Sequence, residues 1–176
     1  MPTTNNDKLG LLGTVTELNN AIHDGKAYSF DVDGTLLLTS SMTLMGRVVD
    51  KEVHFHELEG EFQKGAIRIT LYEAPTTTAD GTLITAHRNM NRNYSDASNM
   101  LLYSEPTVTD TGSKVASAYA PLTGGGANTQ PSQRAIAGGR VLKKNTDYLI
   151  VIENLDNADC TYGIDYIWSE HDESTI

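Results

Sequence analysis

A motif that occurs twice, Tyr-x-x-Pro-Thr-x-Thr-x-x-Gly, limits what this chain can fold into. Its copies cover residues 72–81 and 103–112, and an alternating apolar run leads into each of them. Proline cannot donate a hydrogen bond inside a central strand, and glycine adopts the backbone conformations that turns require. Each copy is therefore predicted to end one strand at its proline and to begin the next after its glycine. A unit of strand, turn and strand would then recur about one hairpin apart.

Alternating apolar and polar residues predict a further pair of strands before the repeat. Tyr28 and Phe30 alternate with polar neighbours, and residues 35–39 continue as an apolar run. Between them, the dipeptide Asp33-Gly34 is typical of a two-residue hairpin turn. The sequence therefore predicts a β-hairpin centred on Asp33-Gly34, with residues 35–39 as its return strand.

Three later segments also have the pattern of strands. Residues 53–57 and 162–168 alternate, whereas residues 148–152 are apolar at every position. A strand that is apolar on both faces is expected at the centre of a sheet. Strands of this length, separated by Gly, Pro, Asn and Asp, predict an all-β fold, namely an antiparallel β-sandwich of the jelly-roll type.

The length of the chain predicts one domain with flexible ends. A chain of 176 residues, of which 39% are hydrophobic, can bury a single core. We assign residues 1–25 to an N-terminal arm, residues 26–170 to the sandwich domain and residues 171–176 to a polar C-terminal tail. The stretch 121–139 contains Gly124-Gly-Gly126 and is expected to be a long loop, used for contacts or mobile.

The charge, the cysteine content and the hydropathy of the chain argue against nucleic-acid binding, a disulfide within the chain and membrane insertion. The chain has 23 acidic and 13 basic side chains, for a net charge of -10, and it has no long basic cluster. Binding to nucleic acid is therefore not expected, because phosphate neutralisation needs clustered Lys and Arg. The single cysteine, Cys160, allows no disulfide within the chain. The sequence has neither an apolar signal core at its start nor a run of about eighteen apolar residues that would predict membrane insertion.

Three segments of the chain resemble a known group of proteins. They are Y-E-A-P-T-T-T-A-D-G-T at 72–82, the Arg-Asn-rich run at 88–93 and L-K-K-N-T-D-Y-L-I-V-I-E-N-L at 142–155. Together they resemble small virion proteins of tailed bacteriophages, of the capsid decoration or cement kind. The resemblance extends over roughly residues 26–169, and it departs from the pattern at Lys144, where proline is common.

The resemblance implies a structural role. A decoration protein binds the major capsid protein on the outer surface of the shell, and it associates with itself as a homodimer or homotrimer. Such a protein is made in the cytoplasm of the bacterial host, needs no cofactor and is not an enzyme. A tail, adaptor or fibre component of the virion is the alternative with the same β-rich composition.

Two segments of the chain are candidates for partner contacts. The loop 88–93 presents two guanidinium groups and three amides, which suit carboxylates and backbone carbonyls of a partner. An internal polar network that ties this loop to its own domain would use the same groups. The arm would contribute apolar residues on one helical face, although Gly10 and Gly13 weaken a helix there; a disordered terminus is the alternative. The candidate contact residues are Arg88, Asn89, Asn91, Arg92, Asn93, Leu11, Leu12 and Val15.

The run F-D-V-D-G-T-L at 30–36 matches the nucleophile motif of haloacid-dehalogenase-like phosphatases. In such an enzyme Asp31 would attack the phosphoryl group, Asp33 would act as general acid, and Mg²⁺ would neutralise the phosphoryl oxygens. That chemistry needs a buried parallel strand before the motif and a helix after it. The preceding residues alternate and no helix pattern follows, so a plain Asp-Gly turn is favoured.

Two metal sites and a sugar site are also conceivable. His54 and His56 lie on one strand face, a spacing that can hold Zn²⁺, with Glu52 or an acidic residue from another strand as a further ligand. A solvated or interfacial face is the plainer interpretation, and it would make an interface sensitive to pH. Asp156, Asp159 and Asp165 lack the spacing of a calcium loop and suit turns. A sugar-stacking platform could use Tyr72, Tyr94, Tyr103, Tyr119 and Trp168, although such aromatics usually belong to a core or interface. We therefore predict no catalytic residue, no metal and no cofactor.

Overall fold

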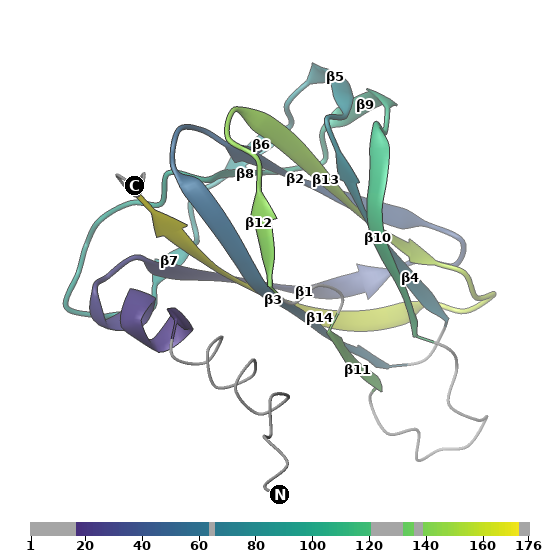
Figure 1. Cartoon of the computed structure of the whole chain (residues 1–176). Coiled ribbons are helices and arrows are strands. Elements are labelled where there is room, and N and C mark those ends of the chain that lie inside the picture. The colour runs from purple at the N-terminus through teal and green to yellow at the C-terminus, as the bar shows by residue number, and fades with distance from the viewer. Residues whose placement is uncertain (1–16, 64–65, 121–131, 136–138, 173–176) are drawn as a thin grey trace, which may run out of the picture.

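The structure is a computed structural model that describes residues 17–63, 66–120, 132–135 and 139–172. Within these ranges the chain is mostly β-structure in antiparallel sheets, with one short helix over residues 17–23 (Figure 1). This confirms the all-β prediction. No helix among the described residues is long and apolar enough to cross a membrane.

Two six-stranded sheets face each other. In sheet A the strand order is β11-β3-β14-β1-β7, with β12 also paired to β3, and in sheet B it is β10-β4-β13-β2-β8-β6. Sheet A consists of β1 (Ala27–Leu36), β3 (Glu52–Gln63), β7 (Arg88–Asn89), β11 (Ser132–Ala135), β12 (Arg140–Leu142) and β14 (Cys160–His171). Sheet B consists of β2 (Ser41–Val48), β4 (Ile67–Glu73), β6 (Thr82–Ile84), β8 (Leu101–Ser104), β10 (Ser113–Ala120) and β13 (Thr146–Asn154).

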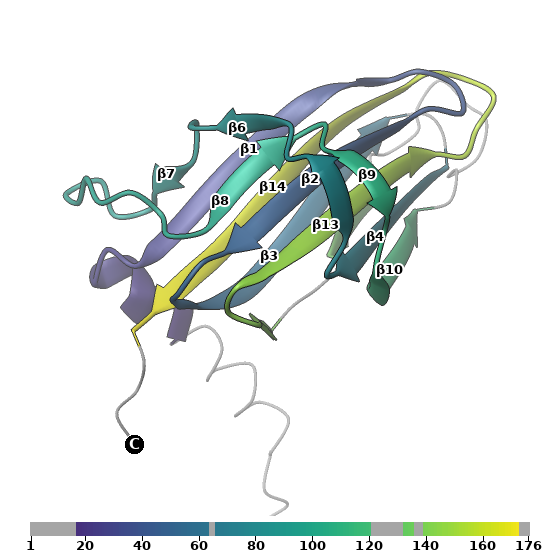
Figure 2. The ribbon, with the colours of Figure 1, turned by 90° about the horizontal axis from the view of Figure 1, so that it is seen from above.

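A third, two-stranded sheet lies outside this pair. It consists of β5 (Thr76–Ala79) and β9 (Thr107–Asp110), which are antiparallel to each other. Figures 1 and 2 show this ribbon on the side of sheet B that faces away from sheet A. We call β5 and β9 the ribbon; each of its strands begins directly after the proline of one copy of the repeated motif.

The hydrophobic core fills the space between sheets A and B. Alternate residues of each strand point into it, as in β13, where Tyr148 and Ile152 are buried. Trp168 of β14 has no exposed surface and stacks on Tyr28 of β1, with ring centroids 5.9 Å apart. β13 pairs with β4 on one side and β2 on the other, which confirms the prediction of a central strand at 148–152.

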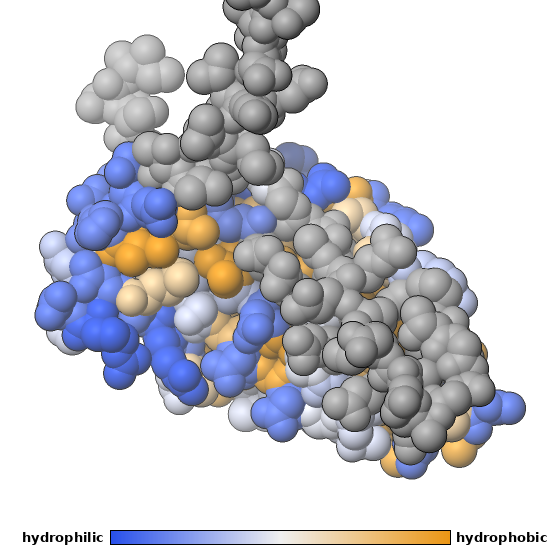
Figure 3. All heavy atoms as spheres, turned by 90° about the horizontal axis from the view of Figure 1, so that it is seen from below, coloured by the Kyte–Doolittle hydropathy of each residue, from blue (hydrophilic) through white to orange (hydrophobic). Residues whose placement is uncertain are grey.

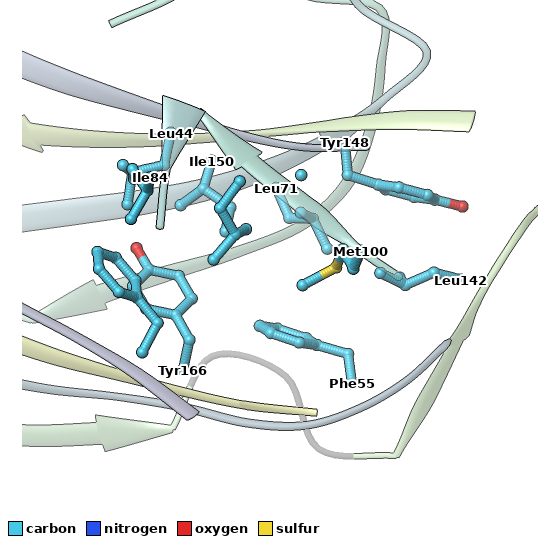
Figure 4. Close-up of a pocket in the computed structure, with 12 residues that line it drawn as sticks. Leu44, Phe55, Leu71, Ile84, Met100, Leu142, Tyr148, Ile150 and Tyr166 are labelled. Atoms are coloured by element: carbon cyan, nitrogen blue, oxygen red, sulfur yellow. The ribbon is translucent and has the colours of Figure 1, made fainter. Parts of the chain in front are cut away.

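A small apolar cavity remains inside the core (Figure 4). Its volume is about 30 Å³, and its lining includes Leu44 and Gly46 of sheet B, Phe55 and Tyr166 of sheet A, and Met100. An apolar space of this size holds about one water molecule at most, so it is a packing gap and not a ligand site.

The predicted hairpin at Asp33-Gly34 is wrong. β1 continues through Gly34 to Leu36 and pairs with β14 along its whole length. The turn comes later, at residues 37–40, and leads into the other sheet. Glycine at position 34 instead leaves room for the side chain of Tyr162 on the neighbouring strand, because a Cβ atom there would lie 2.9 Å from the Tyr162 hydroxyl.

Two predicted boundaries also differ from the structure. The stretch 121–139 is not entirely a loop, because residues 132–135 form β11 and pair with β3; residues 121–131 and 136–138 lie outside the described residues. At the C-terminus, β14 extends to His171, which had been assigned to the tail. Cys160 is buried as a free thiol.

Candidate functional site

The two copies of the motif interlock instead of forming separate hairpins. The first copy joins β4, β5 and β6, and the second joins β8, β9 and β10. β4 of the first copy pairs with β10 of the second, and β8 of the second pairs with β6 of the first. The register of the two pairings is equivalent. Glu73 and Thr82 of the first copy correspond to Ser104 and Ser113 of the second, and Glu73 pairs with Ser113 while Thr82 pairs with Ser104. Each copy therefore pairs with a strand of the other copy, while β4 also pairs with β13 and β8 also pairs with β2.

The turns that leave sheet B are also equivalent. Ala74 and Glu105 have φ values of 56° and 54°, the left-handed conformation that few non-glycine residues adopt. The amide of Ala74 donates to the carbonyl of Asp147 on β13, and the amide of Glu105 donates to that of Thr43 on β2. The two copies thus occupy equivalent positions on either side of the central β13–β2 pair.

The ribbon covers apolar residues on the outer face of sheet B. Met45 and Leu149 are direct neighbours across β2 and β13, and both have no exposed surface, although the core lies on the opposite face. Pro106, at the start of the second ribbon strand, is buried as well. The ribbon therefore forms a third layer over the middle of sheet B.

Arg47 of β2 fixes this layer by charge-assisted hydrogen bonds. Its Nε lies 2.8 Å from Asp147 Oδ1, and its Nη1 lies 2.8 Å from Asp80 Oδ2, at the end of the first ribbon strand. The guanidinium also lies over the ring of Tyr103, 5.4 Å from its centroid. Hydrogen bonds to Asp147 and Asp80 raise the pKa of Arg47, and the bond to Arg47 lowers the pKa of Asp80.

The asparagines of the predicted contact loop bind the chain itself. Asn89 donates to the carbonyl of Gly25 at 2.7 Å, and Asn91 donates to the carbonyl of His23 at 3.1 Å. The side-chain oxygen of Asn91 accepts from both nitrogens of Asn93. The three amides therefore form an internal polar network, which is the alternative to a partner site.

The two arginines of this loop point to solvent. Arg88 forms a long ion pair with Asp31, 3.5 Å, and its side chain is 61% exposed. Arg92 is exposed and has no ion pair with any described residue. Of this loop, Arg88 and Arg92 thus remain available for a partner. The predicted arm residues Leu11, Leu12 and Val15 lie outside the described residues.

Asp31 and Asp33 do not have the surroundings of a phosphatase nucleophile. Both are exposed in the middle of the antiparallel strand β1, and Asp31 lies directly opposite Asp165 on β14. A phosphatase of this type needs its aspartates at the end of a parallel strand, followed by a helix. The D-x-D-G-T match therefore lacks its structural context.

The other predicted clusters are also not brought together. Asp156 and Asp159 lie in the connection between β13 and β14, where Asp159 accepts from the amide of Leu38, whereas Asp165 lies within β14. This connection joins the two sheets. Trp168 of the proposed sugar platform is fully buried in the core.

A cluster of three histidines lies on the outer face of sheet A. His54 and His56 belong to β3 and His171 to β14, and the rings of His54 and His171 are 4.3 Å apart. Glu17, from the helix over 17–23, contacts His54 Nδ1 and lies 3.8 Å from His171 Nε2. One ligand atom from each of Glu17, His54 and His171 lies within 4.8 Å of the other two.

Two neighbours orient these rings. Glu52 lies 2.7 Å from His54 Nε2, which leaves Nδ1 facing Glu17. The hydroxyl of Ser169 lies 2.7 Å from His56 Nε2 and 2.9 Å from His171 Nε2. Burial lowers the pKa of His56 and of His171 and so favours their neutral forms. The hydrogen bond with His54 lowers the pKa of Glu52 and so favours its charged form.

Sequence reasoning found only part of this cluster. The spacing of His54 and His56 predicts one strand face, with Glu52 or an acidic residue from another strand as a further ligand, whereas the structure places Glu52 beside His54 Nε2 and outside the group of three ligand atoms. His171 and Glu17 were missed, because they join the cluster only through the pairing of β3 with β14 and the packing of the helix. No local pattern indicates either contact.

Exposed leucines gather at one end of the sandwich. Leu37 and Leu38, in the turn after β1, are 62% and 55% exposed, and Leu155, after β13, is 42% exposed. Asn154 joins the two turns, since its side-chain amide donates to the carbonyls of Leu37 and Ala158. We call Leu37, Leu38 and Leu155 the leucine tip.

Comparison with known proteins found no matching family model, no matching curated protein and no matching solved structure.

Proposed function

We propose that this protein is a structural component of a tailed-bacteriophage virion, a capsid decoration or cement protein that binds the outer shell. The observation that carries the proposal is the leucine tip. Large apolar side chains grouped at an exposed end of a domain typically mark a protein contact. The tip is held by the hydrogen bonds of Asn154 to the backbone, so it is ordered before any partner binds.

The sheet orders support the jelly-roll form of the sandwich as part of this proposal. Eight strands would form it, in the orders β1-β14-β3-β11 and β2-β13-β4-β10. Consecutive strands β1 to β4 alternate between the two sheets, as do β13 and β14, which is typical of two Greek keys folded together. Viral capsid domains commonly use this arrangement.

The surface supports a role outside the shell and not against the genome. The net charge of -10 disfavours contact with phosphates, while apolar groups and the guanidiniums of Arg88 and Arg92 are available for a protein partner. Figure 3 shows a second place where apolar residues gather, beside a hydrophilic rim, on the face seen from below. A protein that binds the assembled shell and not its free subunits stabilises the shell by mass action. The major capsid protein and further copies of this chain, as a homodimer or homotrimer, are the partners that we propose.

Copy number tests the proposal. Mass spectrometry of gradient-purified particles would measure this protein against the major coat protein. Hundreds of copies per particle are expected of a decoration protein. A handful of copies would assign it to a tail, adaptor or fibre instead, and its absence from particles would refute a virion role.

Binding to undecorated particles tests the tip itself. Leu37→Ser combined with Leu38→Ser should abolish co-sedimentation with the shells, whereas Val141→Ser should not. Val141 is a suitable control because it is also exposed, at 57%, but lies on β12. Equal binding of all three proteins would rule out the leucine tip as the contact.

A further inference from the structure

The cluster of Glu17, His54 and His171 is built from the donor types that bind zinc. Imidazole nitrogens and a carboxylate oxygen are common zinc ligands, and two histidines with one glutamate recur in zinc proteins. A tetrahedral ion with bonds of about 2.0–2.1 Å holds its ligand atoms about 3.3 Å apart. Here His171 Nε2 is already 3.8 Å from Glu17 Oε1, and all three ligand atoms lie within 4.8 Å of one another.

The surroundings of His54 fit a metal ligand as well. A metal-bound histidine usually donates its second ring N–H to a carboxylate, which fixes the tautomer and the direction of the ring. Glu52 lies 2.7 Å from His54 Nε2 and so occupies this second position, while Nδ1 faces Glu17. The cluster therefore contains both the ligands and an outer carboxylate.

Access from solvent is sufficient for an ion to enter. The side chains of Glu17, His54 and His171 are 41%, 22% and 31% exposed. His56 is buried beside them, and the hydroxyl of Ser169 lies between His56 and His171. When this hydroxyl donates its one hydrogen to His56 Nε2, the lone pair of His171 Nε2 is left for the ion. The three ligands leave a fourth position for water or for a further side chain.

We propose that Glu17, His54 and His171 form a binding site for a divalent transition metal, with Zn²⁺ as the preferred ion. The ion joins three segments that are far apart in the sequence, namely the helix over 17–23, the start of β3 and the end of β14. It thereby holds the helix onto sheet A. This proposal is independent of the role in the virion, and it is tested on the purified chain.

Calorimetric titration of Zn²⁺ into the full, untagged chain near neutral pH is the primary experiment. We expect one ion per chain. His54→Gln, His171→Gln and Glu17→Gln should each weaken zinc binding more than about a hundredfold, and Glu52→Gln should weaken it by about ten- to a hundredfold. His23→Gln is the matched control, because His23 is an exposed histidine at the end of the same helix, and its affinity should equal that of the wild type.

Two measurements keep the test decisive if a variant does not fold. Absorption of the Co²⁺ complex of the wild type should show the intense visible bands of a low-coordinate site, and Zn²⁺ should slow amide exchange in residues 17–23. Failure of the wild type to bind Zn²⁺, or equal affinity in the wild type and in a folded His171→Gln variant, would overturn the proposal. Virion incorporation is not used as a readout, so failure of the proposed function would leave this result unaffected.

Discussion

Gly112 lies against the backbone of Glu73, so closely that a Cβ atom at position 112 would be 2.3 Å from the Glu73 carbonyl oxygen. The equivalent contact exists in the other direction, because a Cβ atom at Gly81 would lie 2.2 Å from the carbonyl oxygen of Ser104. Each glycine of the repeated motif thus packs on the turn of the other copy. The glycines are required by these contacts as well as by their φ values of 78° and 90°.

Substitution of either glycine should therefore destabilise the protein. Gly112→Ala and Gly81→Ala should each lower the free energy of unfolding by about 2 kcal/mol or more, because alanine is strained at positive φ and its Cβ would meet backbone atoms. Urea unfolding measures the loss. Similar losses at the two positions would support their equivalence, whereas a neutral effect at either one would contradict the described packing.

Gly46→Ala should have the opposite effect. Gly46 lines the apolar cavity from β2, and a Cβ atom there would meet Met100 Sδ at 3.6 Å, an ordinary contact. Alanine would fill part of the gap and reduce the entropy of the unfolded chain, so we expect a gain of about 0.5–1 kcal/mol. Thermal and urea unfolding of this variant beside Gly112→Ala would compare the two kinds of glycine within one protein.

Glu170 should be among the most sensitive polar residues. Its buried carboxylate accepts hydrogen bonds from the hydroxyl of Ser98 at 2.5 Å and from the amides of Asn99 and Met100 at 2.8 and 2.9 Å. Glu170→Ala should cost about 3 kcal/mol, because it removes these charge-assisted hydrogen bonds and leaves the amide of Asn99 without its acceptor. Asp172→Ala, which removes an exposed carboxylate from the same chain end, should cost far less. Equal urea midpoints for the two variants would contradict this account.

The bond between Arg47 and Asp80 should make the attachment of the ribbon dependent on pH. Because Arg47 lowers the pKa of Asp80, the stabilisation is fully present above the unfolded pKa of 3.8 and is lost as the pH falls through the lower folded value. Asp80→Asn should therefore flatten the decline of the urea midpoint on acidification. Asp96→Asn, an exposed carboxylate in another loop, should keep the decline of the wild type. An unchanged pH profile in Asp80→Asn would show that this pair adds nothing.

The sequence predicts those elements whose cause is local. Both strands that precede the repeated prolines end where expected, at Glu73 and Ser104, and the apolar run at 148–152 is a central strand. The turn expected at Asp33-Gly34 fails because β14 pairs along the whole of β1, and this long-range pairing overrides a local turn preference. The interlocking of the repeats and the approach of Glu17 to His171 depend on partners distant in sequence, which alternation alone cannot identify.

The order of the strands has a consequence for synthesis of the protein. β13 lies in the middle of sheet B and β14 in the middle of sheet A, yet both come after every other strand along the chain. Until residues 146–171 have left the ribosome, β1 and β3 have no common neighbour, and neither have β2 and β4. Before then, both sheets of the nascent chain lack their central strands and have unpaired edges, which favour association with other chains. Folding of this protein is expected to be a late, single event, and to be slow because its strand pairings are long-range. Until it folds, the growing chain needs chaperones to protect its open strand edges.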